Sequence, residues 1–419
     1  MTGQRRNKKT FYPFLPFPTA GGLGGYWSWL RIPTVIRTYL GLLLLTVCVF
    51  ALMYCPQPML YTLSQEFGVS KSNSALLVSV FMFFLVISPM CVGILLDRIG
   101  VRKALLVSTF LVGISGAGIY FAPNFLVLVG VRSFEALFVP VLVTSIMVSI
   151  ASMFRHMDFN RALAGYVSCT LVGSLSGRIL GGWCGELFGW RLTLTGVCVL
   201  FLLALVLIYN VPDTSGGHHT VHNPRVYGKI LRQKGIPSLL FAEAAGLFVF
   251  SAMGNLVPFR MAELGQGHSE GLIGLMYVGY SVGILAGLIR GPLLRVFKKP
   301  SNIILFGSAF YMLACVTLAV PNLWVLFGGL WGVAFGEFLV HANCPGIINH
   351  IAVTGGFDRS MVNGLFLSCY YSGGLVGSYV PGLIYTQFGW MACFGVLEGV
   401  LVLSFLIVLK LHHDIPGIR

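Results

Sequence analysis

The sequence predicts an all-α integral membrane protein with twelve transmembrane helices, grouped as two pseudo-symmetric six-helix bundles. Three observations predict this fold. The chain of 419 residues is 56% hydrophobic and only 10% charged, whereas soluble chains usually carry about 25% charged residues. Apolar runs of about 20 residues, each long enough to cross a hydrocarbon core of roughly 30 Å, recur along the whole chain. The second half of the chain also repeats features of the first.

Hydropathy places six spans in each half of the chain. The first half gives spans at 38–62, 73–95, 102–122, 124–148, 160–184 and 191–211. The second half gives spans at 237–259, 271–290, 301–320, 322–345, 361–386 and 389–410. The predicted parts are a basic cytoplasmic tail (1–36), an N-terminal six-helix bundle (37–211), a cytoplasmic linker (212–236), a C-terminal six-helix bundle (237–410) and a second cytoplasmic tail (411–419).

The basic residues predict the orientation in the membrane. With both termini in the cytoplasm, the outer segments hold only Lys71, Arg191 and Arg260 of the 27 Lys and Arg residues. Two more, Arg132 and Arg178, fall inside spans, and the others fall in cytoplasmic segments. This distribution follows the positive-inside rule. We therefore interpret the net charge of +14 as an orientation signal and expect no nucleic-acid partner.

The chain lacks the sequence motifs of several other functional classes of protein. The ten cysteines lie singly and form no CxxC pair, so we expect no metal, redox site or cofactor. The chain has no GxxxxGK[ST] nucleotide loop, which argues against an enzyme and against an ATP-driven pump. The first 36 residues lack the apolar core and small-residue cleavage site of a signal peptide, so we expect none to be cleaved.

The repeat between the halves appears at an offset of 200 residues, where Phe188–Gly189–Trp190 recurs as Phe388–Gly389–Trp390. Parallel repeats of this kind build secondary transporters whose substrate site lies near the midplane between the repeats. Glycines four residues apart predict a smooth helix face for close packing. The predicted packing glycines are Gly173, Gly177, Gly181, Gly182, Gly373 and Gly377.

The loop between the second and third spans carries a motif, GILLDRIGVRKAL, that begins at Gly93. It resembles the signature of the major facilitator superfamily, G-x-L-a-D-R-x-G-r-k-x-x-l. The resemblance implies the fold of that superfamily and a gate at this loop. Gly93 would let helices approach closely, Gly100 permits a tight turn, and Asp97 can pair with a cation or cap a helix end. Arg98 and Arg102 complete the predicted gating motif.

The fifth span resembles another motif of the superfamily. The stretch LVGSLSGRILGGW, residues 171–183, is similar to the g-x-x-x-G-P-x-x-G-G motif of drug:proton antiporters, with Arg178 in place of the proline. Strings such as YCPQP and YYSGGLVGS look like the YnfM-type bacterial inner-membrane transport proteins. The resemblance implies a monomeric transporter in the bacterial inner membrane, with the lipid bilayer, a small molecule and a coupling proton as its partners.

Ionisable residues inside spans are costly and therefore mark candidate sites. Arg132 and Glu135 are three residues apart and share one helix face, so we expect an ion pair that either releases Glu135 to take a proton or acts as a permanent strut. Glu337 and His341 are four apart, again on one face, and form a second candidate for proton coupling. Glu243 is expected to snorkel or to contact the linker.

The predicted function is proton-coupled export of a small organic compound by alternating access. An uptake symporter for a metabolite is the alternative, and a channel or receptor-like protein is a different class that the repeat and gate disfavour. Arg178 is interpreted as a cation at the outer mouth of the substrate cavity or as a side chain that snorkels to the surface. The substrate's charge stays open, because deep arginines favour anions and acids favour cations. The candidates for the cavity wall are Arg178, Tyr54, Gln57, Asn343, Tyr370 and Tyr371.

Overall fold

The structure is a computed structural model that describes residues 34–154, 156–213, 224–265 and 269–414. All the regular elements in these ranges are helices, and ten of them are long and apolar enough to cross a membrane. The predicted all-α membrane fold is confirmed. Two of the ten, at 161–208 and 361–412, have 48 and 52 residues, over twice what one crossing needs. Twelve crossings would require each of them to cross twice, and that count stays a prediction.

The helices follow the predicted spans closely. The first half contains α1 (Thr34–Tyr54), η2 (Gln57–Met59), α2 (Leu60–Phe67), α3 (Lys71–Ile99), α4 (Val101–Tyr120), α5 (Phe125–Met153) and α6 (His156–Ile208). A short helix, α7 (Pro224–Leu231), lies within the predicted linker. The second half contains α8 (Ile236–Glu263), α9 (Glu270–Met276), η3 (Tyr277–Ser281), α10 (Val282–Leu288), α11 (Arg290–Phe297), α12 (Pro300–Val316), η4 (Thr317–Ala319), α13 (Leu323–His341), α14 (Cys344–Thr354) and α15 (Arg359–Asp414).

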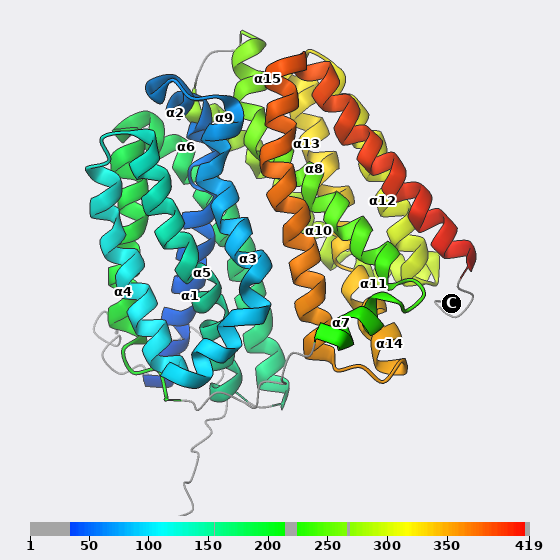
Figure 1. Ribbon diagram of the computed structural model, residues 1–419, viewed down its shortest axis with the longest axis horizontal. Coiled ribbons are helices and arrows are strands. Elements are labelled where there is room, and N and C mark those ends of the chain that lie inside the picture. The colour runs from blue at the N-terminus through cyan, green and yellow to red at the C-terminus, as the bar shows by residue number, and fades with distance from the viewer. Residues whose placement is uncertain (1–33, 155, 214–223, 266–268, 415–419) are drawn as a thin grey trace, which may run out of the picture.

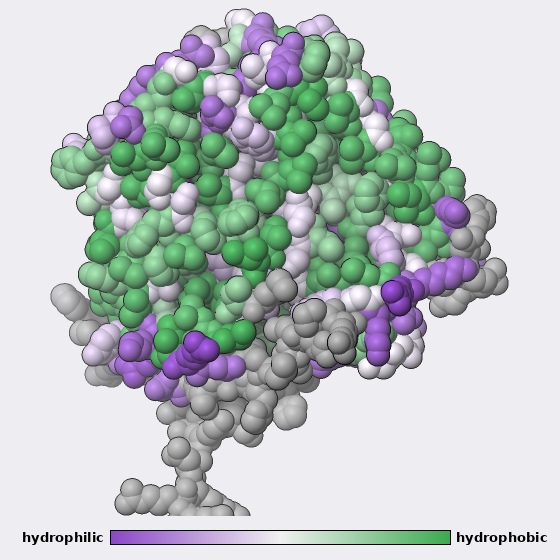
Figure 2. Space-filling view, viewed as in Figure 1, coloured by the Kyte–Doolittle hydropathy of each residue, from purple (hydrophilic) through white to green (hydrophobic). Residues whose placement is uncertain are grey.

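The helices of the two halves gather on opposite sides of the molecule. In Figure 1, α1, α3, α4 and α5 lie on the left, while α10, α12 and α13 lie on the right. We call the end with the α3–α4 turn and α7 the basic end, and the end with α2 the opposite end. A broad hydrophobic surface separates hydrophilic patches at these two ends (Figure 2), as expected for a protein that faces lipid around its middle.

Equivalent asparagines start equivalent helices in the two halves. Asn124 accepts a hydrogen bond from the backbone N–H of Val127 and begins α5. Asn322 accepts from the N–H groups of Trp324 and Val325 and begins α13. Side-chain caps of this type satisfy N–H groups that the first helical turn leaves unpaired. The repeat therefore extends from sequence to the geometry of helix starts.

The Phe-Gly-Trp repeat forms the corner of each long helix. Gly189 and Gly389 have left-handed φ angles of 77° and 80° and interrupt α6 and α15. Only glycine adopts this conformation without a steric penalty from Cβ. The indole of Trp190 donates to Glu66 at 2.6 Å, and that of Trp390 donates to the carbonyl of Leu318 at 3.0 Å. Each corner is thus tied to a neighbour in its own half.

Glycines let the helices approach at their backbones. A Cβ placed at Gly177 would lie 2.6 Å from Cα of Ala51 on α1, and one at Gly173 would lie 2.5 Å from the carbonyl oxygen of Val47. In the second half, Gly373 and Gly377 press in the same way against the backbone of α8. Gly182 differs, because it contacts α9 of the other half.

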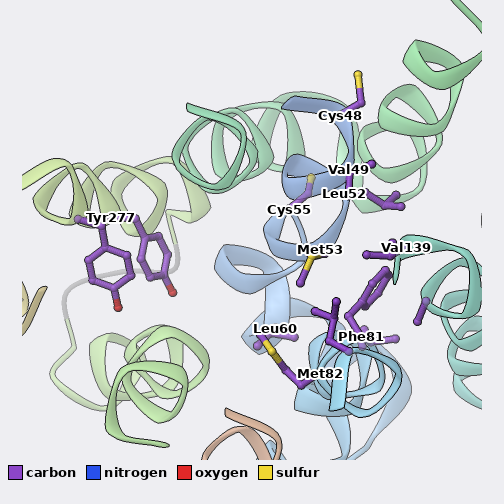
Figure 3. Close-up of a cluster of buried hydrophobic side chains, with 14 of the residues drawn as sticks. Cys48, Val49, Leu52, Met53, Cys55, Leu60, Phe81, Met82, Val139 and Tyr277 are labelled. Atoms are coloured by element: carbon purple, nitrogen blue, oxygen red, sulfur yellow. The ribbon is translucent and has the colours of Figure 1, made fainter. Parts of the chain in front are cut away.

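The core of the first half is built around α1. Figure 3 shows Val49 and Leu52 of α1 near Val139 of α5, and Leu60 near Met82 of α3. All five side chains are buried in one hydrophobic cluster. Burial of this kind fixes α1 within its half, so the residues at its end are held in place beside the other half.

Candidate functional site

A cavity of about 200 Å³ lies between the two halves. It is lined by Phe50 and Tyr54 of α1, Thr170, Leu171, Ser174, Leu175 and Arg178 of α6, Leu247 and Phe250 of α8, Tyr280 and Ser281 of η3, Phe338 and His341 of α13, and Tyr370 and Tyr371 of α15. Both halves of the chain contribute. A position between the two repeats is where the sequence predicts a substrate site, and that role stays a prediction.

Arg178 lies in the cavity wall and is only 3% exposed. Its Nε donates to Oε1 of Gln57 at 2.6 Å, and Nη1 donates back to the carbonyl of Ser174 at 2.9 Å. The guanidinium carbon lies 3.9 Å from the ring centroid of Tyr54 and 5.1 Å from that of Tyr280. Aromatic faces attract a cation and help to hold it out of water. The side chain therefore faces the cavity instead of the outer surface.

Gln57 connects Arg178 to the other half of the chain. Its amide nitrogen donates to Oδ1 of Asn255 on α8 at 2.9 Å, and Asn255 donates to the carbonyl of Ser378 on α15 at 3.3 Å. Because α8 runs from the basic end, Asn255 lies beyond the lining residue Phe250 toward the opposite end. This hydrogen bond therefore bounds the cavity on its far side.

Polar contacts between the halves continue from there to the opposite end. The hydrogen bonds are Lys71–Glu263, Thr62–Glu270, Ser269–Glu186 and Gly271–Glu186. Nearer the basic end, the halves also meet where Ser368 of α15 donates to the carbonyl of Val86 of α3 at 2.8 Å. Most of these polar contacts between the halves, among the described residues, thus lie between the cavity and the opposite end.

A second polar cluster lies on α8 and α13 beside the cavity. Nδ1 of His341 is 2.8 Å from Oε2 of Glu243, and the His341 ring stacks on Tyr370 with centroids 4.6 Å apart. Glu243 is 1% exposed, so the expectation that it snorkels or contacts the linker is wrong. The expected partner of His341, Glu337, is also buried, and its Oε1 has no hydrogen-bond partner among the described residues. Glu337 packs on Gly246 of α8 instead.

Arg132 and Glu135 form an ion pair at 2.7 Å with both side chains fully buried. Glu135 also accepts from Ser115 of α4 at 2.7 Å and from Cys198 of α6 at 3.2 Å. Arg132 donates to the carbonyls of α1 and α3, at residues 52 and 77. Neither side chain lines the cavity. The pair therefore connects five helices inside the first half.

The predicted gating loop forms a tight turn at the basic end. Gly100 ends α3 and begins α4 with a φ of 82°. Arg102 donates from Nη2 to the carbonyl of Tyr209 at 2.9 Å, which ties the loop to the end of α6. Asp97 and Arg98 are exposed there, and Gly93 is half-buried on α3. The gating role of this loop stays a prediction.

The structure brings together four of the six predicted cavity residues, namely Arg178, Tyr54, Tyr370 and Tyr371. Gln57 lies behind them, bonded to Arg178. Asn343 does not line the cavity and accepts a hydrogen bond from Arg290 at 3.0 Å. The sequence-based reasoning missed Tyr280, Asn255 and the Glu243–His341 contact. Tyr280 lies in a short 3-10 helix inside the eighth predicted span, and no hydrophobic periodicity in the sequence predicts this helix. No group of three or more His, Cys, Asp or Glu residues in the described ranges is placed to hold a metal.

Comparison with known proteins identifies the fold. Residues 42–352 match the sequence family described as the Major Facilitator Superfamily. The inner membrane transport protein YnfM of Escherichia coli is 25% identical over 388 residues, covering 91% of this chain and 92% of YnfM. The multi-drug resistance efflux pump PmrA of Streptococcus pneumoniae is 23% identical over 337 residues, covering 78% of this chain and 81% of PmrA.

Two solved structures share the fold. The nucleoside transporter NupG has a TM-score of 0.70 and 13% identity, covering 89% of this chain and 99% of NupG. A bacterial homologue of the human lysosomal transporter Spinster, in an inward-facing and unoccupied conformation, has a TM-score of 0.69 and 14% identity, covering 90% of this chain and 95% of that protein. At these identities the likeness concerns the fold alone.

Proposed function

This chain belongs to the major facilitator superfamily, and we propose that it is a proton-coupled exporter of a small organic compound. Secondary transport follows from the family. Export and proton coupling are the proposal. The observation that carries it is a cavity between the two halves with a buried acid–histidine cluster in contact with its wall.

The contacts between the halves support an alternating-access mechanism. Gln57 and Asn255 hydrogen bond across the far side of the cavity, and further polar contacts follow toward the opposite end. Opening the cavity at that end requires these contacts to break. We propose that the opposite end is the outer one and that the structure represents a state closed to the outside.

We place proton coupling at Glu243, His341 and Glu337. His341 lines the cavity and lies 2.8 Å from Glu243, so it is the group through which a proton passes between the cavity and that carboxyl. Glu337 lies one turn before His341 on α13. Its Oε1 is buried and has no hydrogen-bond partner among the described residues, so Glu337 is the second carboxyl of the proposed cluster. Gain or loss of a proton therefore alters the charge beside the wall where substrate would bind.

The cluster has a route by which to act on the movement of the halves. His341 stacks on Tyr370 of α15, and α15 packs along α3 of the other half through Ser368 and Val86. A change in the charge of His341 therefore changes its contact with Tyr370 on α15, a helix that lies at the interface between the two halves. In the proposed cycle, the protonated cluster and the substrate-loaded cavity favour different arrangements of the two halves.

Two similarities support export. PmrA is described as an efflux pump, and the glycines of the fifth span resemble the antiporter motif. Uptake of a metabolite by symport stays the alternative, because the same fold carries out both export and uptake. Counterflow with and without an imposed pH gradient separates the two, because opposite gradients drive an antiporter and a symporter.

The coupling assignment is tested in proteoliposomes. A stability-shift screen of the purified protein against metabolites and drugs supplies the transported compound. We expect Glu337→Gln and Glu243→Gln to lose transport driven by a pH gradient while exchange continues. Glu398→Gln is the matched control, since Glu398 is a carboxyl in the last predicted span that does not line the cavity. If both cluster variants keep the wild-type response to the gradient, the proton is carried elsewhere.

A further inference from the structure

The two arginines inside spans have different electrostatic surroundings. Arg132 is neutralised by Glu135 at 2.7 Å, away from the cavity. Arg178 is almost as deeply buried, at 3% exposure, but no carboxylate in the described part of the chain forms an ion pair with it. Its contacts are an amide oxygen, a carbonyl oxygen and aromatic rings. The cavity wall therefore holds a permanent positive charge without a counter-ion.

A buried charge without a partner is unfavourable, and an anion of matching shape relieves that cost. The carboxylates nearest the cavity do not supply it. Glu243 contacts Nδ1 of His341 at 2.8 Å, and Glu337 is not among the residues that line the cavity. Arginine is also the side chain best suited to a flat anionic group, because its N–H donors match two oxygens at once. The position facing Arg178 is accordingly suited to an anion brought by the ligand.

The rest of the wall selects for a flat apolar body. Tyr54 and Tyr280 both lie against the guanidinium, and Phe250 packs on Tyr280 with ring centroids 4.4 Å apart. Tyr370 and Tyr371 close another side. A cavity of roughly 150 Å³ is enough to bind benzene, so the 200 Å³ present here suits a compound with a single ring.

We infer that this cavity binds a small aromatic organic anion, with the anionic group on Arg178 and the ring among the tyrosines. This inference rests on the proposed function only in taking the cavity as the transporter's substrate site. It concerns the charge of the substrate, which the sequence leaves open, and it depends on Arg178 alone because Arg132 does not line the cavity.

The test is binding to the purified full-length protein in detergent, by calorimetry and by thermal shift. The probes are benzenesulfonate, its neutral analogue methyl phenyl sulfone, and phenyltrimethylammonium. Benzenesulfonate keeps its charge over the whole working pH range. We expect it to bind about tenfold or more tightly than the sulfone, which is the usual value of a hydrogen bond to a charged group. The cation should not bind measurably.

Variants locate the anion on Arg178. Arg178→Gln should abolish the preference for the sulfonate over the sulfone, and Arg178→Lys should retain part of it. Arg191→Gln is the control, because Arg191 is an exposed arginine that pairs with Glu66 far from the cavity. If Arg178→Gln does not fold, the three probes on the wild-type protein still decide the question.

Three results overturn the inference: no detectable binding of benzenesulfonate, equal binding of the sulfone, or tighter binding of the cation. Failure of the proposed function gives a different signature. Benzenesulfonate that binds and is transported, with a flux that a pH gradient does not change, leaves the anion site standing and refutes proton coupling. Transport of a cation driven by a pH gradient supports proton coupling and refutes the anion site.

Discussion

The Arg132–Glu135 pair gives a sharp test of how buried charge is used in this protein. The Glu135→Gln substitution keeps the size of the side chain and removes the counter-ion of a guanidinium that is fully buried. Removing one partner of such a pair typically costs about 3–5 kcal/mol. Arg132 also donates to carbonyls of α1 and α3. We therefore expect the substitution to weaken the packing of these helices and to lower the free energy of unfolding.

The assay is unfolding of the purified protein in mixed micelles with increasing denaturing detergent. Glu135→Gln should lower the free energy of unfolding by about 3–5 kcal/mol. The double variant Arg132→Met/Glu135→Leu should return to within about 1 kcal/mol of the wild type, because apolar replacement of a buried pair is often neutral. The strut interpretation fails if Glu135→Gln is as stable as the wild type but no longer responds to a pH gradient. Glu135 would then be the proton carrier, which is the first of the two candidates predicted from the sequence.

Two further predictions concern helix packing and closure. Gly177→Ala should destabilise the protein by about 1–3 kcal/mol, because its Cβ would lie 2.6 Å from Cα of Ala51, whereas ordinary contacts begin at 3.4 Å. Gly196→Ala on the same helix meets open space and should be neutral or stabilising by up to about 1 kcal/mol; equal melting temperatures for the two variants would contradict this reasoning. Lys71→Ala removes a partly exposed pair with Glu263 and should cost less than about 1 kcal/mol in stability. Lys71→Ala should nevertheless open the opposite end more often. A cysteine introduced between this ion pair and the cavity should then react faster with a reagent added at the opposite end, and high salt should have the same effect on the wild type. Unchanged labelling would show that the pair does not hold this end shut.

Much of the fold was predictable because lipid imposes simple rules on a sequence. Apolar length locates the spans, and the 200-residue repeat predicts two related halves. The ion pair of Arg132 and Glu135 was also predictable, since residues three apart on a helix are neighbours whatever surrounds them.

The details of the candidate site were not predictable, because they depend on contacts between distant segments. His341 and Glu337 are correctly spaced for a pair, yet the packing of α8 on α13 brings Glu243 to His341 instead. In the sequence, Asn255 is an ordinary polar residue of the seventh span. Only the packing of η2 against α8 brings Gln57 opposite it. Spacing along one helix cannot show which residue of a second helix arrives at the same place.

The charge of Arg178 has a consequence for the electrical behaviour of transport. A membrane potential does work on any net charge that a protein moves across the field, about 2.3 kcal/mol per elementary charge per 100 mV. With a monovalent anion bound, the Arg178 site is neutral as the halves rearrange, but the empty site carries one positive charge through the same movement. Voltage would therefore act on the return of the empty carrier and leave the loaded step almost untouched. One-for-one exchange of substrate should be insensitive to the membrane potential, whereas the rate of net flux should change with it. Recording of transport currents, and not radiotracer exchange, would therefore detect the charge of Arg178.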